Sequence, residues 1–375
     1  MGKWEMVRLG DVSTGKVTNI AQKDLSDNEG EYPIYGASGL IKHVDFYREE
    51  QPYIGVVKDG AGVGRTALMP AKSSLIGTMQ YILPNETVNV GYLYYAISKM
   101  NLARFFTGAT IPHIYYKDYK NEQMPLPPMD VQIKITNMLD RVAALIEKRK
   151  VQIEKMDLLV KSQFVEMFGD FAVNPKEFAF TQLCDVAEIV SGVAKGRKLP
   201  KDGIKQIPYM RVANVKDGYI DLFDIKHIEA TEVEMERYRL KYNDVLLTEG
   251  GDPDKLGRGA IWKNKIEICI HQNHVFRVRL NKNVINPVFF AEYLKHPKAK
   301  KYFLSCAKQT TGIASINMTQ LKLTPTPLPP LFLQRRFVNF VHAIDKSKSE
   351  LQQGLNKLEL LYKSLMQKCF DGEMF

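Results

Sequence analysis

The sequence predicts an α+β fold: two mixed α/β domains separated by an antiparallel coiled coil of two long helices, with internal pseudo-two-fold symmetry. Three observations predict it. The chain repeats itself at a long lag, each repeat ends in a long heptad-patterned segment, and the stretches before those segments alternate between strand and short-helix patterns. With 375 residues, the chain is long enough for two to three domains.

The repeat is clearest where each long segment begins. Pro125-Leu126-Pro127-Pro128 recurs as Pro327-Leu328-Pro329-Pro330, a lag of 202 residues that also joins Gln132 to Gln334. Near the start the matching lag is 174, so the second globular part carries about 28 extra residues. Prolines fit the first turn of a helix and not its interior, and they therefore mark boundaries. The sequence predicts globular domains at residues 1–128 and 171–330, and long helices at residues 129–170 and 331–375.

Within the globular parts, short apolar runs bounded by Gly and Asn or Asp predict strands. The expected strands include residues 53–57, 207–212 and 245–248, and the expected short helices are residues 91–104 and 287–303.

The long segments carry apolar residues at alternating spacings of four and three, which is typical of a coiled coil. Arg149, Gln163 and Lys348 interrupt the pattern. Each helix should run about 37 residues, or roughly 55 Å at ~1.5 Å per residue. The predicted seam consists of Leu139, Val142, Ile146, Ile153, Met156 and Val160 in the first helix, and Val341, Ile344, Leu351, Leu355, Leu358, Tyr362 and Leu365 in the second.

Charge and cysteine content narrow the function. The net charge is +10, and residues 171–330 hold 25 Lys and Arg against 17 Asp and Glu, whereas residues 1–130 hold 13 against 14. A basic excess in one globular part indicates a polyanionic partner there. Four scattered cysteines without a CxxC pair favour a reducing, cytoplasmic location and exclude disulfide and zinc frameworks. No apolar run approaches the roughly 18 residues of a membrane helix, so no membrane partner is expected.

Several short sequence segments follow one another along the chain in a characteristic order. They are residues 4–12 (WEMVRLGDV), 32–39 (YPIYGASG), 208–215 (PYMRVANV), 249–260 (EGGDPDKLGRGA) and 370–375 (FDGEMF), together with the two Pro-Leu-Pro-Pro entries. This layout resembles the specificity subunit of type I restriction–modification enzymes. The resemblance implies two target-recognition domains that each read one half of a split site in double-stranded DNA, with the helices setting the gap between the halves.

The resemblance also implies partners. Two methyltransferase subunits and the restriction (translocase and nuclease) subunits are expected to bind this chain. S-adenosylmethionine, ATP and magnesium would act in those partners, so the chain itself is expected to hold no cofactor, no metal and no catalytic residue. Two alternatives stay open: a coiled-coil adaptor that does not read DNA, and a stand-alone DNA-modifying enzyme.

The candidate catalytic motifs of the sequence are incomplete, which argues against the enzyme alternative. The run Gly60-Ala61-Gly62-Val63-Gly64 lacks the spacing of nucleotide-binding loops, which favours a strand-joining turn. Asn174-Pro175-Lys176-Glu177 lacks the third residue of the adenine methyltransferase tetrapeptide. His271 and His274 have no nearby cysteine or acidic ligand pattern, which favours core or hydrogen-bonded histidines over a metal site.

Candidate DNA contacts in the second domain are cations and amides in glycine-rich or loop segments, where the backbone can approach a duplex closely. Arg258 is the candidate guanine reader and Asn214 the candidate adenine reader. Solvated cations in an ordinary hairpin turn, and turn chemistry for the asparagine, are the alternatives. The full set is Lys195, Arg197, Lys198, Arg211, Asn214, Lys255 and Arg258.

The first domain offers Lys58 and Arg65 in the equivalent turn. A segment rich in small hydroxyl and glycine residues follows, and it aligns at the 202-residue lag with one in the second domain. Such segments donate hydrogen bonds to phosphates or base edges, although a structural anchor is the alternative. The candidates are Thr107, Thr110, His113, Tyr115, Tyr116 and Lys117, with Thr310 and Thr311 in the second copy.

Overall fold

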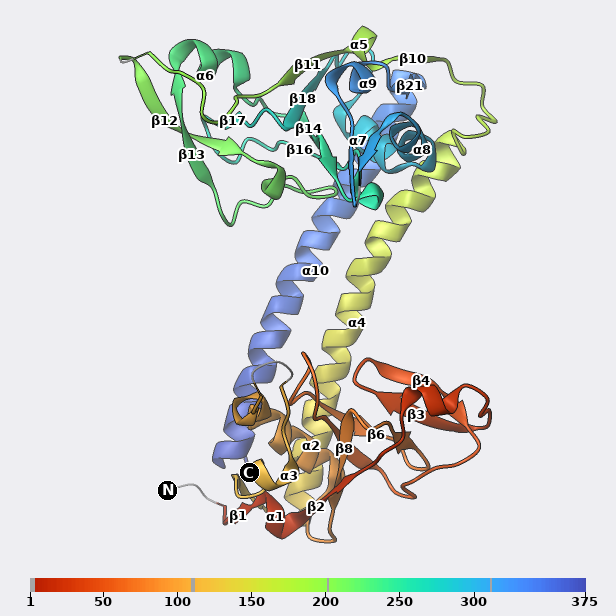
Figure 1. Ribbon diagram of the computed structural model, residues 1–375, viewed down its shortest axis with the longest axis vertical. Coiled ribbons are helices and arrows are strands. Elements are labelled where there is room, and N and C mark those ends of the chain that lie inside the picture. The colour runs from red at the N-terminus through yellow and green to blue at the C-terminus, as the bar shows by residue number, and fades with distance from the viewer. Residues whose placement is uncertain (1–3, 109–111, 201, 311) are drawn as a thin grey trace. The chain divides into compact units, whose positions relative to one another are not determined.

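The computed structural model describes residues 4–108, 112–200, 202–310 and 312–375 and divides into two compact units. Unit 1 comprises Met1–Gln152 and Leu351–Phe375, and unit 2 comprises Ile153–Glu350. Two long helices, α4 (Met129–Phe168) and α10 (Leu331–Asp371), each begin in one unit and end in the other (Figure 1).

Unit 1 is built on a four-stranded antiparallel sheet with the strand order β2-β8-β5-β6. A smaller sheet has the order β4-β3-β7, and β1 pairs with β9. The strands are β1 (Met6–Arg8), β2 (Ser13–Val17), β3 (Tyr32–Gly36), β4 (Gly39–Val44), β5 (Tyr53–Val57), β6 (Thr66–Met69), β7 (Ser74–Leu75), β8 (Met79–Pro84) and β9 (Gln123–Pro125). The helices are α1 (Leu9–Val12), α2 (Val90–Lys99), α3 (Tyr116–Tyr119) and the 3-10 turns η1 (Gln22–Leu25) and η2 (Leu102–Phe105).

Unit 2 has the same topology. Its four-stranded sheet has the order β11-β18-β14-β16, its smaller sheet the order β13-β12-β17, and β10 pairs with β21. The strands are β10 (Phe180–Gln182), β11 (Ala187–Ser191), β12 (Ile204–Met210), β13 (Lys226–Thr231), β14 (Val245–Thr248), β15 (Gly250–Gly251), β16 (Gly259–Ile261), β17 (Ile270–His271), β18 (Val275–Leu280), β19 (Lys308–Thr310), β20 (Ile313–Ser315) and β21 (Pro325–Pro327). The helices are α5 (Leu183–Val186), α6 (Glu232–Tyr238), α7 (Pro287–Lys295), α8 (Pro297–Cys306), α9 (Met318–Lys322) and the 3-10 turns η3 (Val212–Asn214) and η4 (Pro253–Lys255).

Two expected short helices are each broken in two. The stretch 91–104 divides into α2 and η2 because Asn101 adopts a left-handed conformation (φ 50°). The stretch 287–303 divides into α7 and α8, because Pro297 cannot continue a helix and instead starts the next one. The expected strand 207–212 ends at Met210, where η3 begins.

The long helices pack antiparallel within each unit. In unit 1, Leu139 of α4 shares a core with Cys369 of α10, while Lys150 further along α4 pairs with Glu359 at 3.9 Å. In unit 2, Lys348 donates to the Asp157 carboxylate at 2.6 and 2.7 Å, and the rings of Phe164 and Phe337 lie 5.3 Å apart. Residue numbers therefore rise on one helix as they fall on the other. The predicted fold class is confirmed.

All thirteen seam positions are buried or half-buried, whereas most other positions in the middle of the two helices are exposed. Two of the polar interruptions have contacts that explain them. Lys348 forms the ion pair with Asp157, and the Arg149 guanidinium lies against Gly354, where an added Cβ would come within 2.7 Å of Nη1.

A buried glutamine joins the start of each long helix to its domain. The Gln132 Nε2 donates to the carbonyls of Pro127 (2.9 Å) and Thr87 (3.1 Å), and its Oε1 accepts from the Asn89 backbone N–H (2.7 Å). Gln334 does the same with Pro329 (2.7 Å), Val284 (3.2 Å) and Asn286 (2.7 Å). Asn89 and Asn286 cap α2 and α7, so one side chain ties the helix entry to the next helix cap.

We call each buried glutamine with its three hydrogen bonds a glutamine lock, and the lock of unit 2 gives a stability prediction. Gln334→Ala leaves three backbone groups without partners at a position that is 0% exposed, so the free energy of unfolding of unit 2 should fall by about 2–4 kcal/mol. The control is Gln352→Ala on the exposed face of α10, which should change it by less than about 0.5 kcal/mol. Urea denaturation of the full chain measures both. Equal effects would show that the lock contributes nothing.

Candidate nucleic-acid interface

The loops that carry the predicted DNA contacts lie at one end of each four-stranded sheet. Because neighbouring strands are antiparallel, the end of β11, the start of β18, the end of β14 and the start of β16 lie together. The same holds for β2, β8, β5 and β6 in unit 1. We call this edge the loop end. In unit 2 it carries residues 192–198, 272–274 and 249–258, and in unit 1 residues 18–22, 76–78 and 58–65.

The aligned hydroxyl-rich segments lie beside these loops in both units. In unit 2, β15 pairs with β20, and the Ile316 N–H donates to the Glu249 carbonyl at 2.9 Å. In unit 1, His113 forms bridges with Asp59 and Thr107, and the Ile114 N–H donates to the Lys58 carbonyl at 3.0 Å. The sequence alignment of the two segments therefore corresponds to one structural position. Thr110 and Thr311 lie outside the described residues, and so does the side chain of Thr310.

Arg258 sits at the start of β16 on a turn that requires glycine. Gly257 has φ +68°, and a Cβ there would meet the Phe303 ring at 2.2 Å. Among the described residues, the Arg258 guanidinium has no hydrogen bond or ion pair, and its Nε is buried without a partner. Its neighbour Lys255 is instead paired with Asp252. Arg258 is thus held at the loop end with its donors uncommitted.

The basic loop after β11 is held by one of its own cations. Arg197 donates to both Glu234 oxygens (2.5 and 2.7 Å) and to the Glu229 carbonyl (2.7 Å), and the Glu234 hydrogen bond raises the pKa of Arg197. Glu234 also completes the N-terminal capping box of α6. Because its guanidinium is bonded to Glu234, Arg197 holds the loop in place, and its phosphate contact stays a prediction. Lys195 and Lys198 remain exposed.

The pair Arg211 and Asn214 has a structural role. Asn214 is 3% exposed; its amide donates to the carbonyls of Asp221 (2.9 Å) and Asp224 (3.1 Å), and its Oδ1 accepts from the Arg211 N–H (3.1 Å). Arg211 forms an ion pair with Asp224 at 3.0 Å. The Asn214 side chain therefore forms the turn bonds that were considered as its alternative role, and its contact with adenine stays a prediction.

In unit 1, the two predicted cations of the β5–β6 turn contact acceptors within their own domain. Lys58 is 17% exposed and lies 3.5 Å from Asp59, whose other oxygen contacts His113 Nδ1 at 2.7 Å. Arg65 is exposed but donates to the Ala37 and Gly62 carbonyls (3.1 and 3.3 Å). Thr107 is exposed, and its backbone pairs with His113.

The aromatic residues that follow His113 have different positions. The Tyr116 hydroxyl donates to the Ser13 carbonyl at 2.7 Å, and its ring packs on Gly15, where a Cβ would come within 2.3 Å. Tyr116 therefore anchors the segment to β2. Tyr115 stays 42% exposed, with the Lys117 ammonium 5.5 Å from its ring centroid.

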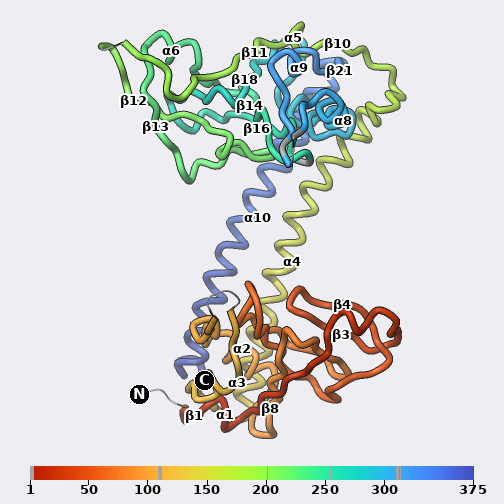
Figure 2. The backbone as a smooth tube through the Cα atoms, in the orientation of Figure 1, coloured from red at the N-terminus to blue at the C-terminus, as the bar shows by residue number. Residues whose placement is uncertain are grey.

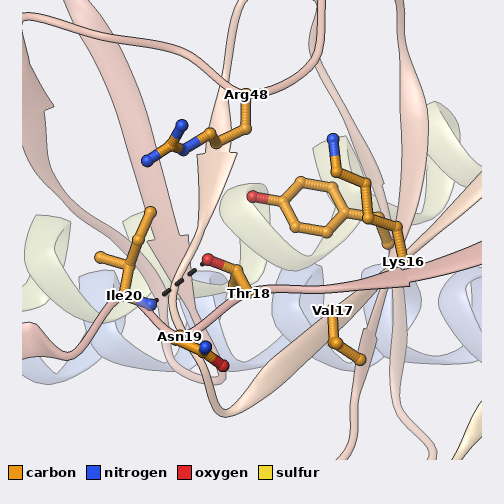
Figure 3. Close-up of a pocket in the computed structure, with 7 residues that line it drawn as sticks. Lys16, Val17, Thr18, Asn19, Ile20 and Arg48 are labelled. Carbon is orange, nitrogen blue, oxygen red and sulfur yellow. Dashed lines mark hydrogen bonds between the residues drawn. The ribbon is translucent and has the colours of Figure 1, made fainter.

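The structure adds a feature that no sequence motif marks. A hollow of about 410 Å³ in unit 1 is lined by Lys16, Val17, Thr18, Asn19, Ile20, Arg48 and Tyr81 (Figure 3). Its rim joins the loop end, because the Gly77 N–H donates to the Ile20 carbonyl (2.7 Å) and the Lys58 N–H to the Thr78 carbonyl (3.0 Å). Lys16 is paired with Glu49 at 2.5 Å, whereas Arg48 forms no ion pair with any described residue.

The segments that suggested catalysis are structural. Residues 58–65 join β5 to β6, as predicted for a strand-joining turn. His271 is fully buried; its Nδ1 contacts the Val275 carbonyl at 2.7 Å, and burial lowers its pKa to about 4. His274 contacts Glu249. Asn174 forms a turn with φ 54° and bonds the Phe178 backbone. The described residues contain no group of three or more potential ligands arranged for a metal ion.

The chain thus has a duplicated α+β architecture with one loop end in each repeat. The family model described as type I restriction modification DNA specificity domain matches residues 1–155 and again residues 175–360. The chain belongs to this family and carries two of its domains, which confirms the prediction of a type I specificity subunit with two target-recognition domains.

Individual relatives agree with this assignment. The EcoKI specificity subunit of Escherichia coli is 23% identical over 336 residues, covering 83% of this chain and 72% of the relative. The putative MjaX specificity subunit of Methanocaldococcus jannaschii is 29% identical over 203 residues, which are 54% of this chain and 47% of that protein. This chain therefore spans about half the length of MjaX. A crystal structure of the M. genitalium S subunit has the same fold, with a TM-score of 0.61, 16% identity and coverage of 98% and 96%.

Among the described residues, no helix combines the length and apolar character needed to cross a bilayer.

The turn that presents Arg258 gives a second prediction. Gly257→Ala must overcome both a positive φ and the Phe303 ring, so the free energy of unfolding of unit 2 should fall by about 2–4 kcal/mol. Gly196→Ala is the matched control, since Gly196 has φ +75° with no atom within 4 Å and meets only the conformational cost of about 1–2 kcal/mol. An equal effect of the two substitutions in denaturant titrations would contradict the packing argument.

Proposed function

We propose that this chain is the non-catalytic DNA-reading subunit of a cytoplasmic type I restriction–modification complex, and that each unit reads one half of a bipartite target with its loop end. Methyltransferase and restriction subunits would bind to it and supply the chemistry, with S-adenosylmethionine, ATP and magnesium acting there. The observation that carries the proposal is the shared topology: two sheets of identical strand order bring distant basic, hydroxyl and glycine segments to the same edge.

Arg258 is the main base-reading candidate in unit 2. Arginine reads guanine through two parallel hydrogen bonds to O6 and N7, which needs a guanidinium whose donors are free and whose position is fixed. The other arginines near this edge are committed: Arg197 to Glu234, Arg211 to Asp224. Arg258 alone among these three has no acceptor within the described structure.

Unit 1 is nearly neutral, so only a few of its residues are available to contact phosphates. Several of its cations pair with carboxylates, as with Arg8 and Asp11, Lys16 and Glu49, and Arg104 and Glu122. Arg48, in the hollow beside the loop end, does not. Its position next to Thr18 and Asn19 suits a phosphate, whose oxygens accept from guanidinium, hydroxyl and amide donors.

The helices support the partner proposal. Leu158 and Leu159 repeat as Leu360 and Leu361, and all four are exposed, at 59%, 45%, 67% and 48%. The repeat cannot be explained by core packing, because these side chains lie outside the core. One exposed leucine pair in each unit suits two copies of one partner, in line with two methyltransferase subunits. One structurally similar chain (TM-score 0.58, 17% identity) comes from work on complex assembly of a type I restriction–modification system.

Arg258→Ala should weaken binding to the specific site about 10- to 100-fold and relax base choice at one position of one half-site. Arg258→Lys should not restore it, because a lysine cannot form the two parallel bonds. Lys282→Ala is the control, since Lys282 is exposed in the turn after β18 at the opposite end of the sheet. Binding of the partner-bound complex to a library of substituted sites measures this; an equal loss for every sequence would make Arg258 a phosphate contact.

Arg48→Ala should behave as the loss of one phosphate contact. Affinity should fall for all sequences alike, and the slope of log K against log salt should become shallower by about 1. Lys120→Ala removes an exposed charge near α1, at the other end of the β2 sheet, and should leave the slope unchanged. An unaltered slope for Arg48→Ala, or a change confined to one base position, would contradict the phosphate role.

A further inference from the structure

A histidine fixed by a carboxylate occurs at the loop end of both units. In unit 1, His113 Nδ1 lies 2.7 Å from an Asp59 oxygen, and in unit 2 His274 Nδ1 contacts Glu249. Glu249 directly follows β14, and Asp59 lies two residues after the end of the equivalent strand β5. The histidines come from different segments, since His113 lies between η2 and α3 and His274 lies in the β17–β18 turn. The arrangement is therefore not a consequence of the sequence repeat.

Neighbouring residues hold both the backbone of His113 and one nitrogen of its ring. Its backbone N–H and carbonyl both bond Thr107 at 2.8 Å, and Asp59 holds Nδ1. The second Asp59 oxygen lies 3.5 Å from Lys58 Nζ, so each carboxylate oxygen has a partner within the unit. The ring is 39% exposed, and its Nε2 contacts no polar atom of the described residues. A rigid, single free nitrogen is thus presented beside the glycine-rich loop.

The carboxylate decides what that nitrogen can bind. Asp59 only accepts, so the neutral ring carries its proton on Nδ1 and leaves Nε2 as a hydrogen-bond acceptor. In unit 2, the His274 Nε2 lies 3.3 Å from the Asn273 amide nitrogen, a donor, which fits the same tautomer. Phosphates offer acceptors only. In the major groove, the donors of DNA are the exocyclic amino groups of adenine (N6) and cytosine (N4).

We propose that His113 is a specificity-determining residue of unit 1, whose Nε2 accepts a hydrogen bond from the amino group of one adenine or cytosine, with Asp59 as its positioning residue. This inference rests on the proposed DNA-reading function of unit 1. It restricts one position of the target half-site to an amino-bearing base, and it distinguishes His113 from the cations around it, which contact acceptors.

The test uses the full chain in complex with its methyltransferase subunits and a DNA duplex carrying its methylated motif. Each adenine of the motif is replaced in turn by purine, and each cytosine by 2-pyrimidinone, because these analogues lack only the amino group. One position in one half should lose about 10- to 100-fold in affinity with the wild-type chain. His113→Phe, which keeps a ring without the nitrogen, should bind the natural base and its analogue equally at that position.

Two further variants complete the test. Asp59→Asn should reduce discrimination at the same position only, because its amide can donate to Nδ1 and shift the ring proton to Nε2. His43→Phe, an exposed histidine on β4, should leave all positions unchanged. The inference is overturned if His113→Phe keeps the wild-type analogue pattern, or if it weakens every sequence equally, as a phosphate contact would. If His113→Phe does not fold, two other outcomes overturn the inference. One is a wild-type scan in which no position depends on an amino group, and the other is an amino-dependent position that Asp59→Asn leaves unchanged. A wild-type complex without sequence preference would instead refute the proposed function itself.

Discussion

The structure depends on one packing constraint: each unit completes its core with a helix end that comes from the other half of the sequence. Unit 1 buries Cys369 and Phe370 of α10, and the Phe370 ring stacks on Tyr92 of α2 at 5.1 Å. Figure 2 shows the backbone of α10 ending beside the domain that contains α2. Unit 2 buries Phe164 and Phe168 of α4, with the Phe168 ring 4.8 Å from Phe289 of α7. Aromatic side chains of this size dominate core energetics, so neither sheet has a closed core until both helices are in place.

This constraint links folding to recognition. The sheets that close on the helices also determine where their loop ends lie, and the glutamine locks fix the entry of each helix to the cap of α2 or α7. Arg258 and His113 are then held by local geometry, the first by a glycine turn against Phe303 and the second by Asp59 and Thr107. Recognition residues on rigid supports lose little entropy on binding, which favours discrimination between bases.

The sequence predicted the architecture because the repeat and the heptads are properties of the chain itself. Gln132 and Gln334 were recognisable as equivalent positions of the repeat, although the hydrogen bonds that each forms were not predictable. The candidate DNA contacts were less predictable. Whether an arginine is free depends on partners distant in sequence: Glu234 neutralises Arg197 from 37 residues away, and Asp224 occupies Arg211. Arg48 carries no motif, and only the folding of residues 16–20 beside it makes it a candidate. The short helices were mispredicted because Asn101 and Pro297 break them locally.

The central claim is that two loop ends in one chain specify the two halves of one DNA target. The most direct measurement is genome-wide mapping of methylated bases in cells that contain this chain and in cells that lack it. The account predicts a motif that depends on the chain and consists of two short specified halves around an unspecified gap. Identical methylation in both cells, or a chain-dependent motif that is continuous without a gap, would contradict it.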